Sequence, residues 1–372
     1  MRRIPMALSA VGAAAIITTG ALAWADTGRP ASASLQAGGH AGAASSGGSV
    51  SGPARSGRVA GSANSADSVR GARTASTATM SGGTSGTTTS WKYPVVYSGT
   101  AAAAYAGAHP NTSPAGSNDW SCKPSAAHPY PVVLVHGTIE NMTYNWYTLS
   151  PLLADEGYCV FALNYGQEPG LHAGLPGATE PGGVGPIEDS AAQLEGFINK
   201  VLAAAGASKV DIVGHSQGGM MPRYNMKFLG ATPQVDKLVG LAPSNHGTTA
   251  DGIAQLPGGA QLLALAIGYS AQEQLAGSPF MQKLSAGGDT VPGPVYTVIE
   301  TAYDEVVTPY TSAFLTGPDV TNILLQHQCA VDGDDHLAIS FDAIAMRDVL
   351  NALDPAHAVA PGCHPTLPFN GG

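Results

Sequence analysis

The stretch that decides the fold is KVDIVGHSQGGMMPRY, residues 209–224. Its first half is a β-branched run of the kind that forms a buried strand, and its last residues are compatible with a helix. Ser216 lies between the two halves, in the pattern Gly214-His215-Ser216-Gln217-Gly218. This pattern, at a turn from strand to helix, is typical of a nucleophile elbow, whose flanking residues must be small to avoid a clash. We therefore predict that Ser216 is a nucleophile and not part of a plain glycine-rich turn.

Short apolar runs on both sides of this stretch alternate with amphipathic patterns. The runs predict six buried strands, over residues 130–137, 158–166, 209–214, 237–243, 294–301 and 320–326. Apolar residues with helical spacing predict helices over 190–203 and 336–353. Because strands and helices alternate, we expect an α/β fold with a mostly parallel sheet that is covered by helices on both faces.

The base and the acid that a serine nucleophile needs are predicted downstream of Ser216. A serine hydroxyl is a weak nucleophile until a base removes its proton. In folds with this elbow the acid, and then the histidine, follow the serine along the chain. His336 is the expected base because, of the histidines after Ser216, it alone follows a loop and begins a predicted helix. Asp304, in the loop after strand 294–301, is the expected acid. His215, inside the elbow, should point away from Ser216.

Two hydrogen-bond donors are expected for the oxyanion that forms when the serine attacks a carbonyl group. One is the main-chain N–H of Gln217, which directly follows the nucleophile. The other is Thr138, which follows His136-Gly137 at the end of the first predicted strand and offers both an N–H and a hydroxyl. A simple strand-ending turn at His136-Gly137 is the alternative.

Three aspartates, Asp332, Asp334 and Asp335, directly precede His336. We interpret them as a solvated acidic loop. A calcium-binding loop is the alternative, although the spacing does not match the EF-hand pattern. The chain has no C-x-x-C motif or clustered Cys/His pair of the kind that binds zinc. We therefore predict a site without a metal and without a cofactor.

Residues 1–90 differ in composition from the rest of the chain. Arg2 and Arg3 precede an uncharged apolar run that ends in Ala23-Trp24-Ala25. This predicts a secretory signal peptide over residues 1–25, with an uncleaved membrane anchor as the alternative. Residues 26–90 are mostly Gly, Ala, Ser and Thr, which predicts a disordered extension. Residues 91–372 are expected to form one catalytic domain, secreted and without a membrane segment after signal cleavage.

Charge and cysteine content narrow the class of protein further. Residues 91–372 hold 9 Lys/Arg and 24 Asp/Glu. Nucleic acid is therefore not an expected partner, since its binding depends on cationic contacts with phosphate.

All four cysteines lie in residues 91–372, and an even number in an exported chain indicates two disulfides. Of the three possible pairings we favour Cys122–Cys159 and Cys329–Cys363, which join sequence neighbours. A monomer is expected.

Two segments break the alternation of strands and helices. Residues 166–186 are too rich in Gly and Pro for a regular element, and residues 251–275 contain an apolar patch at 262–267. Long irregular insertions in a compact domain are often functional, so either segment could form a lid over the site. For 262–267, a lid or rim that meets a lipid surface and an ordinary core helix are equal alternatives.

Four motifs carry a resemblance to a known family: VLVHGT, VGHSQGG, YDEVVTP and DDHLAIS. The chain from residue 91 to the C-terminus resembles the α/β-hydrolase lipases of the class 2 bacterial triacylglycerol lipase family, and it is similar to the fungal lipase-B type. The resemblance implies a triad of Ser216, Asp304 and His336, with Thr138 and Gln217 in the oxyanion hole. Similar cysteine placement supports the favoured disulfide pairing. The fungal lipases have Pro-Gly where this chain has His136-Gly137, and a longer C-terminus, so the shape of their acyl pocket does not transfer.

The function that the resemblance implies is hydrolysis of a carboxylic ester through an acyl-enzyme. The simplest form is a lipase that acts on triacylglycerol or related esters. Such an enzyme could meet its substrate at a lipid–water interface. A short-chain carboxylesterase or a polyester depolymerase with the same triad is the first alternative. A secreted, non-catalytic surface-binding protein is an alternative of another class. Acyl-chain preference and the role of the extension are left open.

Overall fold

The computed structural model describes residues 91–168 and 181–372. The predicted signal peptide over 1–25, the predicted extension over 26–90 and most of segment 166–186 lie outside the described residues. Within those described residues, no helix has the length and apolar character needed to cross a membrane.

One parallel sheet of six strands forms the centre of the described domain, in the order β2-β1-β3-β4-β5-β6. The strands are β1 Val132–Val135, β2 Val160–Leu163, β3 Val210–His215, β4 Val235–Leu241, β5 Val295–Glu300 and β6 Val320–Leu324. Each coincides with one of the six predicted runs, to within three residues at its ends. The predicted fold class, an α/β-hydrolase with a parallel sheet, is confirmed.

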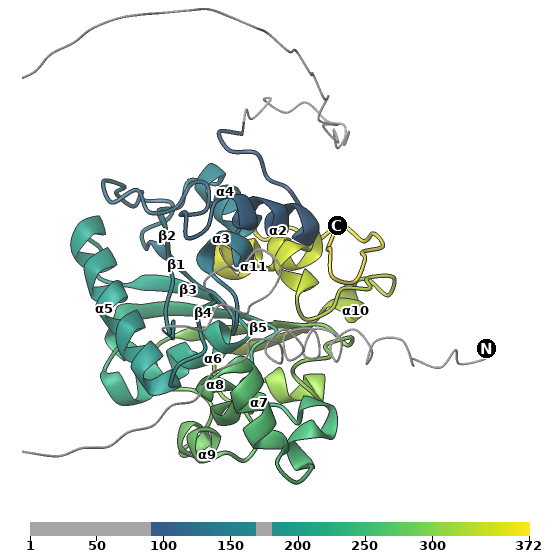
Figure 1. Ribbon diagram of the computed structural model, residues 1–372. Helices are drawn as coiled ribbons and strands as arrows, with labels where there is room; N and C mark the ends of the chain where they lie inside the picture. Colours follow the sequence, from purple (N-terminus) through teal and green to yellow (C-terminus); the bar gives the residue numbers. More distant parts are fainter. Residues whose placement is uncertain (1–90, 169–180) are drawn as a thin grey trace, which may run out of the picture. The chain divides into compact units, whose positions relative to one another are not determined.

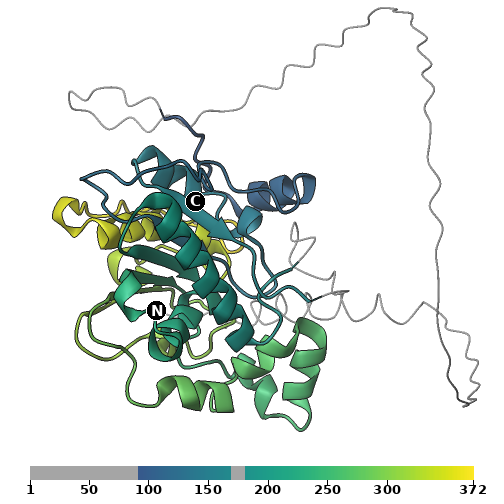
Figure 2. The same ribbon diagram turned by 90° about the vertical axis from the view of Figure 1, so that its left-hand side faces the viewer.

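Ten α-helices accompany the sheet in the described part of the chain. They are α2 Gly99–Ala108, α3 Met142–Asn145, α4 Leu149–Asp155, α5 Ile187–Ala205, α6 Gln217–Tyr224, α7 Gly259–Ile267, α8 Tyr269–Glu273, α9 Pro279–Ser285, α10 Leu325–Gln328 and α11 Ala343–Leu353. Figure 2 shows the helices of the green segment grouped together beyond the sheet. This group contains the segment 251–275 that breaks the alternation in the sequence.

Alternate residues of the strands point to opposite faces of the sheet and pack under different helices. On β1, Val133 and Val135 join a core with α5, α6 and α9, whereas Val132 and Leu134 join a core with α4 and α11. Figure 1 shows α4 and α11 on one side of the sheet and α5 and α6 on the other. Burial on both faces explains why the central strands are continuous apolar runs in the sequence.

Two predicted elements differ from the structure. The helix predicted from residue 336 begins only at Ala343, because the side chain of Asp342 caps it by accepting hydrogen bonds from the N–H groups of Ile344 and Ala345. Strand β6 was expected to be buried, but its residues are exposed or half-buried. It is one of the two edge strands and pairs only with β5, whereas the other edge strand, β2, is buried.

Disulfides tie two peripheral segments to the sheet region. Cys122, in the loop before β1, is bonded to Cys159, the residue before β2. Cys329, directly after α10, is bonded to Cys363 in the C-terminal segment. The structure therefore contains the pairing between sequence neighbours that the sequence favours.

Candidate active site

Ser216 occupies a strained turn between β3 and α6. Its backbone angles are φ 54° and ψ −122°, a combination that a non-glycine residue adopts rarely and at an energetic cost. A Cβ atom on Gly214 would lie 1.9 Å from the carbonyl oxygen of Gly218, and one on Gly218 would lie 2.1 Å from that of Val135. Both glycines are therefore required for this turn, as the G-x-S-x-G pattern predicts. Strain of this kind persists where the surrounding structure imposes it, typically at a functional site.

The predicted site residues all follow the carboxyl ends of strands in the parallel sheet. Thr138 comes after β1, Ser216 after β3, Asp304 after β5 and His336 after β6. Because the strands are parallel, these ends meet at one edge of the sheet. Residues almost two hundred positions apart in the sequence are thereby brought to one place.

His336 and Asp304 form a close buried pair. Nδ1 of His336 lies 2.8 Å from Oδ2 of Asp304, while Oδ1 of Asp304 accepts the N–H groups of Val306 and Val307 at 2.8 and 2.7 Å. These contacts fix the carboxylate and, through it, the ring. Burial alone would lower the pKa of His336, but the charges of Asp304 and Glu305 outweigh burial and raise the pKa to about 9.

Ser216 lies on the wall of the same cavity as His336. In the part of the chain that the structure describes, no hydrogen bond joins Ser216 Oγ to the ring of His336. Hydrogen bonds between catalytic groups are often long without substrate and tighten when substrate is bound. Ser216 and His336 thus line one cavity, and Asp304, which does not line it, is joined to the ring of His336.

The two predicted oxyanion donors, Thr138 and Gln217, are held by side-chain hydrogen bonds. The amide groups of Gln217 and Gln274 both donate to Oγ1 of Thr138, at 3.2 and 2.9 Å. Since both lone pairs of Oγ1 are then used, its own O–H remains free to donate. Among the described residues, the main-chain N–H groups of Thr138 and Gln217 have no acceptor. Three donors are thus available for an oxyanion.

A second buried acid–histidine pair, Glu140 and His215, is hydrogen-bonded to the main chain of His336. Nδ1 of His215 lies 2.9 Å from Oε2 of Glu140, and Nε2 of His215 lies 2.8 Å from the main-chain oxygen of His336. Glu140 Oε2 also accepts the N–H of Gly137 at 2.9 Å. Burial would raise the pKa of Glu140, but the charge and hydrogen bond of His215 outweigh it and lower this pKa. His215 therefore connects the loop that carries Thr138 to the loop that carries His336.

Sequence reasoning missed three of the residues that hold the site together. Glu140 and His215 are 75 positions apart, and Gln274 is 136 positions from Thr138. No motif links such residues. The available signal was that His215 lies inside the elbow motif and that Glu140 closely follows the VLVHGT motif. Glu305, the residue after the predicted acid, lines the cavity, and its Oε2 accepts the N–H of His336 at 3.3 Å. Burial, and then the charge of Asp335, raise the pKa of Glu305 to about 7.

The cavity in front of Ser216 has a volume of about 420 Å³ and mostly apolar walls. Its apolar side chains come from several parts of the chain: Ile139, Ile253, Leu263, Ile267, Leu275, Val306, Val307, Leu337 and Phe369. Helix α7 supplies Leu263 and Ile267 to the wall, while its Leu262 and Leu265 are 56% and 84% exposed. The patch 262–267 is therefore part of the rim of the cavity and not an ordinary core helix.

The acidic run before His336 is not a solvated loop, contrary to the interpretation of the sequence. Asp332, Asp334 and Asp335 are all buried, at 1%, 0% and 4% exposure. The C-terminal segment contributes to their surroundings, since Phe369 N–H donates to Asp335 and Thr366 Oγ1 donates to Asp332. Sequence patterns could not show that this segment packs there.

Comparisons with known proteins concern the family and the fold of the chain. Residues 129–346, more than half of the chain, match the family model described as Lipase (class 2). Triacylglycerol lipases from Pseudarthrobacter phenanthrenivorans and Burkholderia plantarii are each 36% identical over 104 residues, 27% of this chain. The matched stretch covers only 28% and 25% of the length of these relatives.

Among solved structures, lipase B of Aspergillus fumigatus is similar in fold, with a TM-score of 0.51 and 22% identity over 67% of this chain and 56% of that chain. This likeness concerns the fold alone. The family match, together with an elbow serine, a buried Asp–His pair and an apolar cavity at one edge of the sheet, leads to one conclusion: the chain belongs to the class 2 lipase family.

Proposed function

We propose that this protein is a secreted serine ester hydrolase that acts as a lipase on triacylglycerol or related carboxylic esters through an acyl-enzyme. The observation that carries the proposal is the meeting of a strained elbow serine, Ser216, and the Asp304–His336 pair at one apolar cavity. Membership of the class 2 lipase family supports ester hydrolysis as the reaction. The two disulfides support an oxidising location outside the cytosol.

In the proposed mechanism, His336 removes the proton of Ser216 Oγ as this oxygen attacks the ester carbonyl carbon. The raised pKa of His336 favours the imidazolium that forms, and Asp304 holds the ring in the required tautomer. The N–H groups of Thr138 and Gln217 and the hydroxyl of Thr138 donate to the oxyanion, where each well-placed donor contributes about 3 kcal/mol.

The second half of the reaction uses the same groups. His336 gives its proton to the leaving alcohol as the tetrahedral intermediate collapses to an ester of Ser216. Water, deprotonated by His336, then attacks this ester, and the carboxylic acid is released with Ser216 restored.

The shape and surface of the site favour an apolar acyl chain. The walls of the cavity are apolar, so an extended alkyl chain would be transferred there from water at a gain of about 0.8 kcal/mol per methylene group. The exposed Leu262 and Leu265 lie on α7, the helix whose Leu263 and Ile267 line the cavity, and they fit contact with a lipid surface. The first alternative, a short-chain esterase or polyester depolymerase, would use the same triad but bind a different ester in the cavity.

A chain-length series tests the proposal directly. Hydrolysis rates should rise from p-nitrophenyl acetate to octanoate, triolein emulsion should be hydrolysed, and a polyester film should release little product. A best rate with acetate and no action on triolein would remove the lipase proposal.

Ser216→Ala should lower kcat by about 10⁶-fold, whereas Ser208→Ala, a control at an exposed serine, should leave it unchanged. Full activity in Ser216→Ala would favour the non-catalytic binding protein together with a contaminating esterase.

A further inference from the structure

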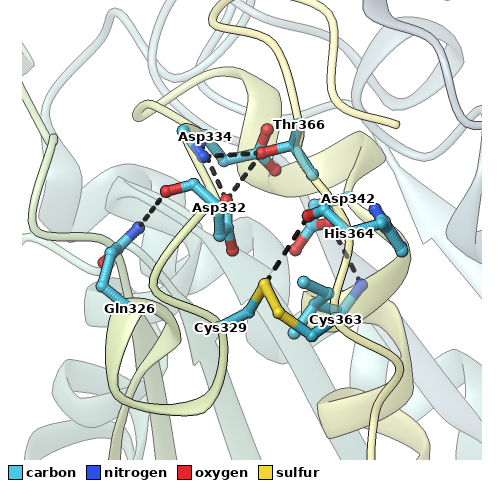
Figure 3. Close-up of a disulfide and its surroundings, with 10 residues drawn as sticks. Gln326, Cys329, Asp332, Asp334, Asp342, Cys363, His364 and Thr366 are labelled. Atoms are coloured by element: carbon cyan, nitrogen blue, oxygen red, sulfur yellow. Dashed lines mark hydrogen bonds between the residues drawn. A yellow bond between two sulfur atoms is a disulfide. The ribbon is translucent and has the colours of Figure 1, made fainter.

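Three buried carboxyl groups lie together beside the Cys329–Cys363 disulfide, outside the triad. They belong to Asp332, Asp334 and Asp342, here called the acidic cluster, and one oxygen from each lies within 4.8 Å of the others. Figure 3 shows the cluster between the disulfide and Thr366. None of the three side chains lines the cavity of Ser216. The acidic cluster is therefore a separate feature of the molecule.

Several oxygens of the acidic cluster are buried without a partner. Within the described residues, neither carboxyl oxygen of Asp334 has a hydrogen bond, and Oδ2 of Asp332 has none. Asp334 and Asp332 are 0% and 1% exposed. No Lys, Arg or His side chain of the described residues forms an ion pair with the cluster. Leaving carboxylate oxygens buried and unpaired is costly, so such oxygens point to a bound group.

The remaining oxygens show that the cluster is held in place. Oδ1 of Asp332 accepts the hydroxyl of Thr366 at 2.7 Å and the N–H of Asp334 at 2.9 Å. The two oxygens of Asp342 accept the N–H groups of Ile344 and Ala345, one each. A carboxylate oxygen has a second lone pair, so these contacts leave ligand capacity on both residues. The oxygens are thus fixed before any ligand arrives.

The chemistry of this arrangement selects the class of ligand. Carboxylate oxygens prefer hard cations, and Ca²⁺ takes them at about 2.3–2.6 Å, so two of its ligands can be up to about 5 Å apart. One oxygen from each of the three carboxyl groups lies within 4.8 Å of the others, which fits inside this span. Mg²⁺ needs ligands at about 2.0–2.1 Å in strict octahedral geometry and fits less well. The nearby sulfur atoms of Cys329 and Cys363 are bonded to each other, so they offer no thiolate to a softer metal.

We propose that Asp332, Asp334 and Asp342 bind one Ca²⁺ ion that fixes the loop carrying His336. Asp332 and Asp334 lie four and two residues before His336, and Asp342 caps α11 six residues after it. An ion between them joins the two ends of this loop. The main-chain oxygen of Asp334 also accepts the hydroxyl of Thr301, which follows β5 and precedes Asp304. The ion acts by positioning and does not touch the substrate.

Calorimetry on the full chain tests the proposal. The protein, with both disulfides intact, is treated with EDTA, dialysed and titrated with CaCl₂ and, separately, MgCl₂. We expect one Ca²⁺ per chain, weaker Mg²⁺ binding and a Ca²⁺-dependent rise in melting temperature, because a ligand that binds only the folded state stabilises it. Asp334→Asn should weaken Ca²⁺ binding at least about 10-fold, an effect of the size seen when groups around a metal are changed.

Controls separate this site from others. Asp319→Asn makes the same substitution at an exposed carboxylate and should leave Ca²⁺ binding unchanged. Asp332→Asn is the second variant if Asp334→Asn does not fold. Ser216→Ala should bind Ca²⁺ like the unchanged protein, so the result does not depend on ester hydrolysis. No binding heat and no melting shift at millimolar Ca²⁺ would overturn the proposal, as would unchanged binding in both Asp332→Asn and Asp334→Asn.

Discussion

Buried carboxylates lie on two sides of His336 in opposite electrostatic surroundings. On the side of the cavity, Asp304 faces His336 at 2.8 Å and Glu140 faces His215 at 2.9 Å. On the other side, the acidic cluster has no cationic side chain as a partner in the described part of the chain. The pKa values follow this division. At Glu140, burial would raise the pKa, but His215 outweighs burial and the pKa is lowered. At Asp334, burial and then the charges of Asp342 and Asp332 raise the pKa to about 9.

The comparison shows that burial alone does not decide what a carboxylate does. All these groups are buried, yet Asp304 and Glu140 each orient a histidine ring, whereas the acidic cluster has no cationic partner among the described residues. The same substitution, a carboxylate to its amide, should therefore have different consequences on the two sides.

The largest effect is expected for Asp304→Asn. An amide at this position cannot stabilise the imidazolium of His336 and favours the wrong tautomer, so kcat should fall by about 10⁴-fold. Steady-state kinetics with a p-nitrophenyl ester measures this effect. Glu305→Gln is the matched control, because Glu305 hydrogen-bonds the main-chain N–H of His336 and acts on the ring through its charge, without a hydrogen bond to the ring, so the loss should be far smaller. Equal losses in the two variants would contradict the division of roles.

Glu140→Gln should mainly affect stability. The change leaves the ring of His215 buried without its carboxylate partner, which costs about 3–5 kcal/mol of unfolding free energy for a buried pair. Urea unfolding measures the cost. Glu188→Gln removes a carboxylate from an ion pair with Lys283 that is half-exposed on both sides, and the unfolding midpoint should change little. If Glu140→Gln unfolds at the same urea concentration as Glu188→Gln, the pairing of His215 with Glu140 does not contribute to the stability of the fold.

The last prediction is a pH dependence of stability that comes from the acidic cluster. With EDTA present, the folded state holds a proton on Asp334 up to about pH 9, whereas an unfolded aspartate releases it near its ordinary pKa of about 3.9. Since the folded state binds more protons in this window, its stability contribution is complete below about pH 4 and is lost as the pH rises through 9.

Urea unfolding between pH 5 and 9 measures this slope. The unchanged protein should lose stability toward pH 9, Asp334→Asn should lose less, and Ca²⁺ should reverse the loss. A slope that Asp334→Asn does not change would place the titrating group elsewhere.

The sequence predicts the parts of the site that depend on local geometry. Gly214 and Gly218 around Ser216 mark a turn that only small residues allow, and apolar runs mark all six strands. The six strands in turn place Thr138, Asp304 and His336 at one edge of the sheet. Family resemblance named the same residues.

The rest of the site depends on tertiary packing that no local pattern encodes. The pairing of Glu140 with His215 and the burial of Asp335 beside the C-terminal segment both follow from contacts between distant segments. Acidic residues in a row are usually solvated, so the sequence favoured that interpretation for the run before His336. Only the position of Thr366 and Phe369 shows why the run is buried.

The most direct test of the central claim is to trap the acyl-enzyme. The protein is mixed with p-nitrophenyl butyrate, quenched in acid within the first turnovers, digested and analysed by mass spectrometry. The account predicts a butyryl group on the peptide that contains Ser216, at Ser216 itself, and none in Ser216→Ala. A butyryl group on another residue, or turnover with no acylated peptide, would contradict it.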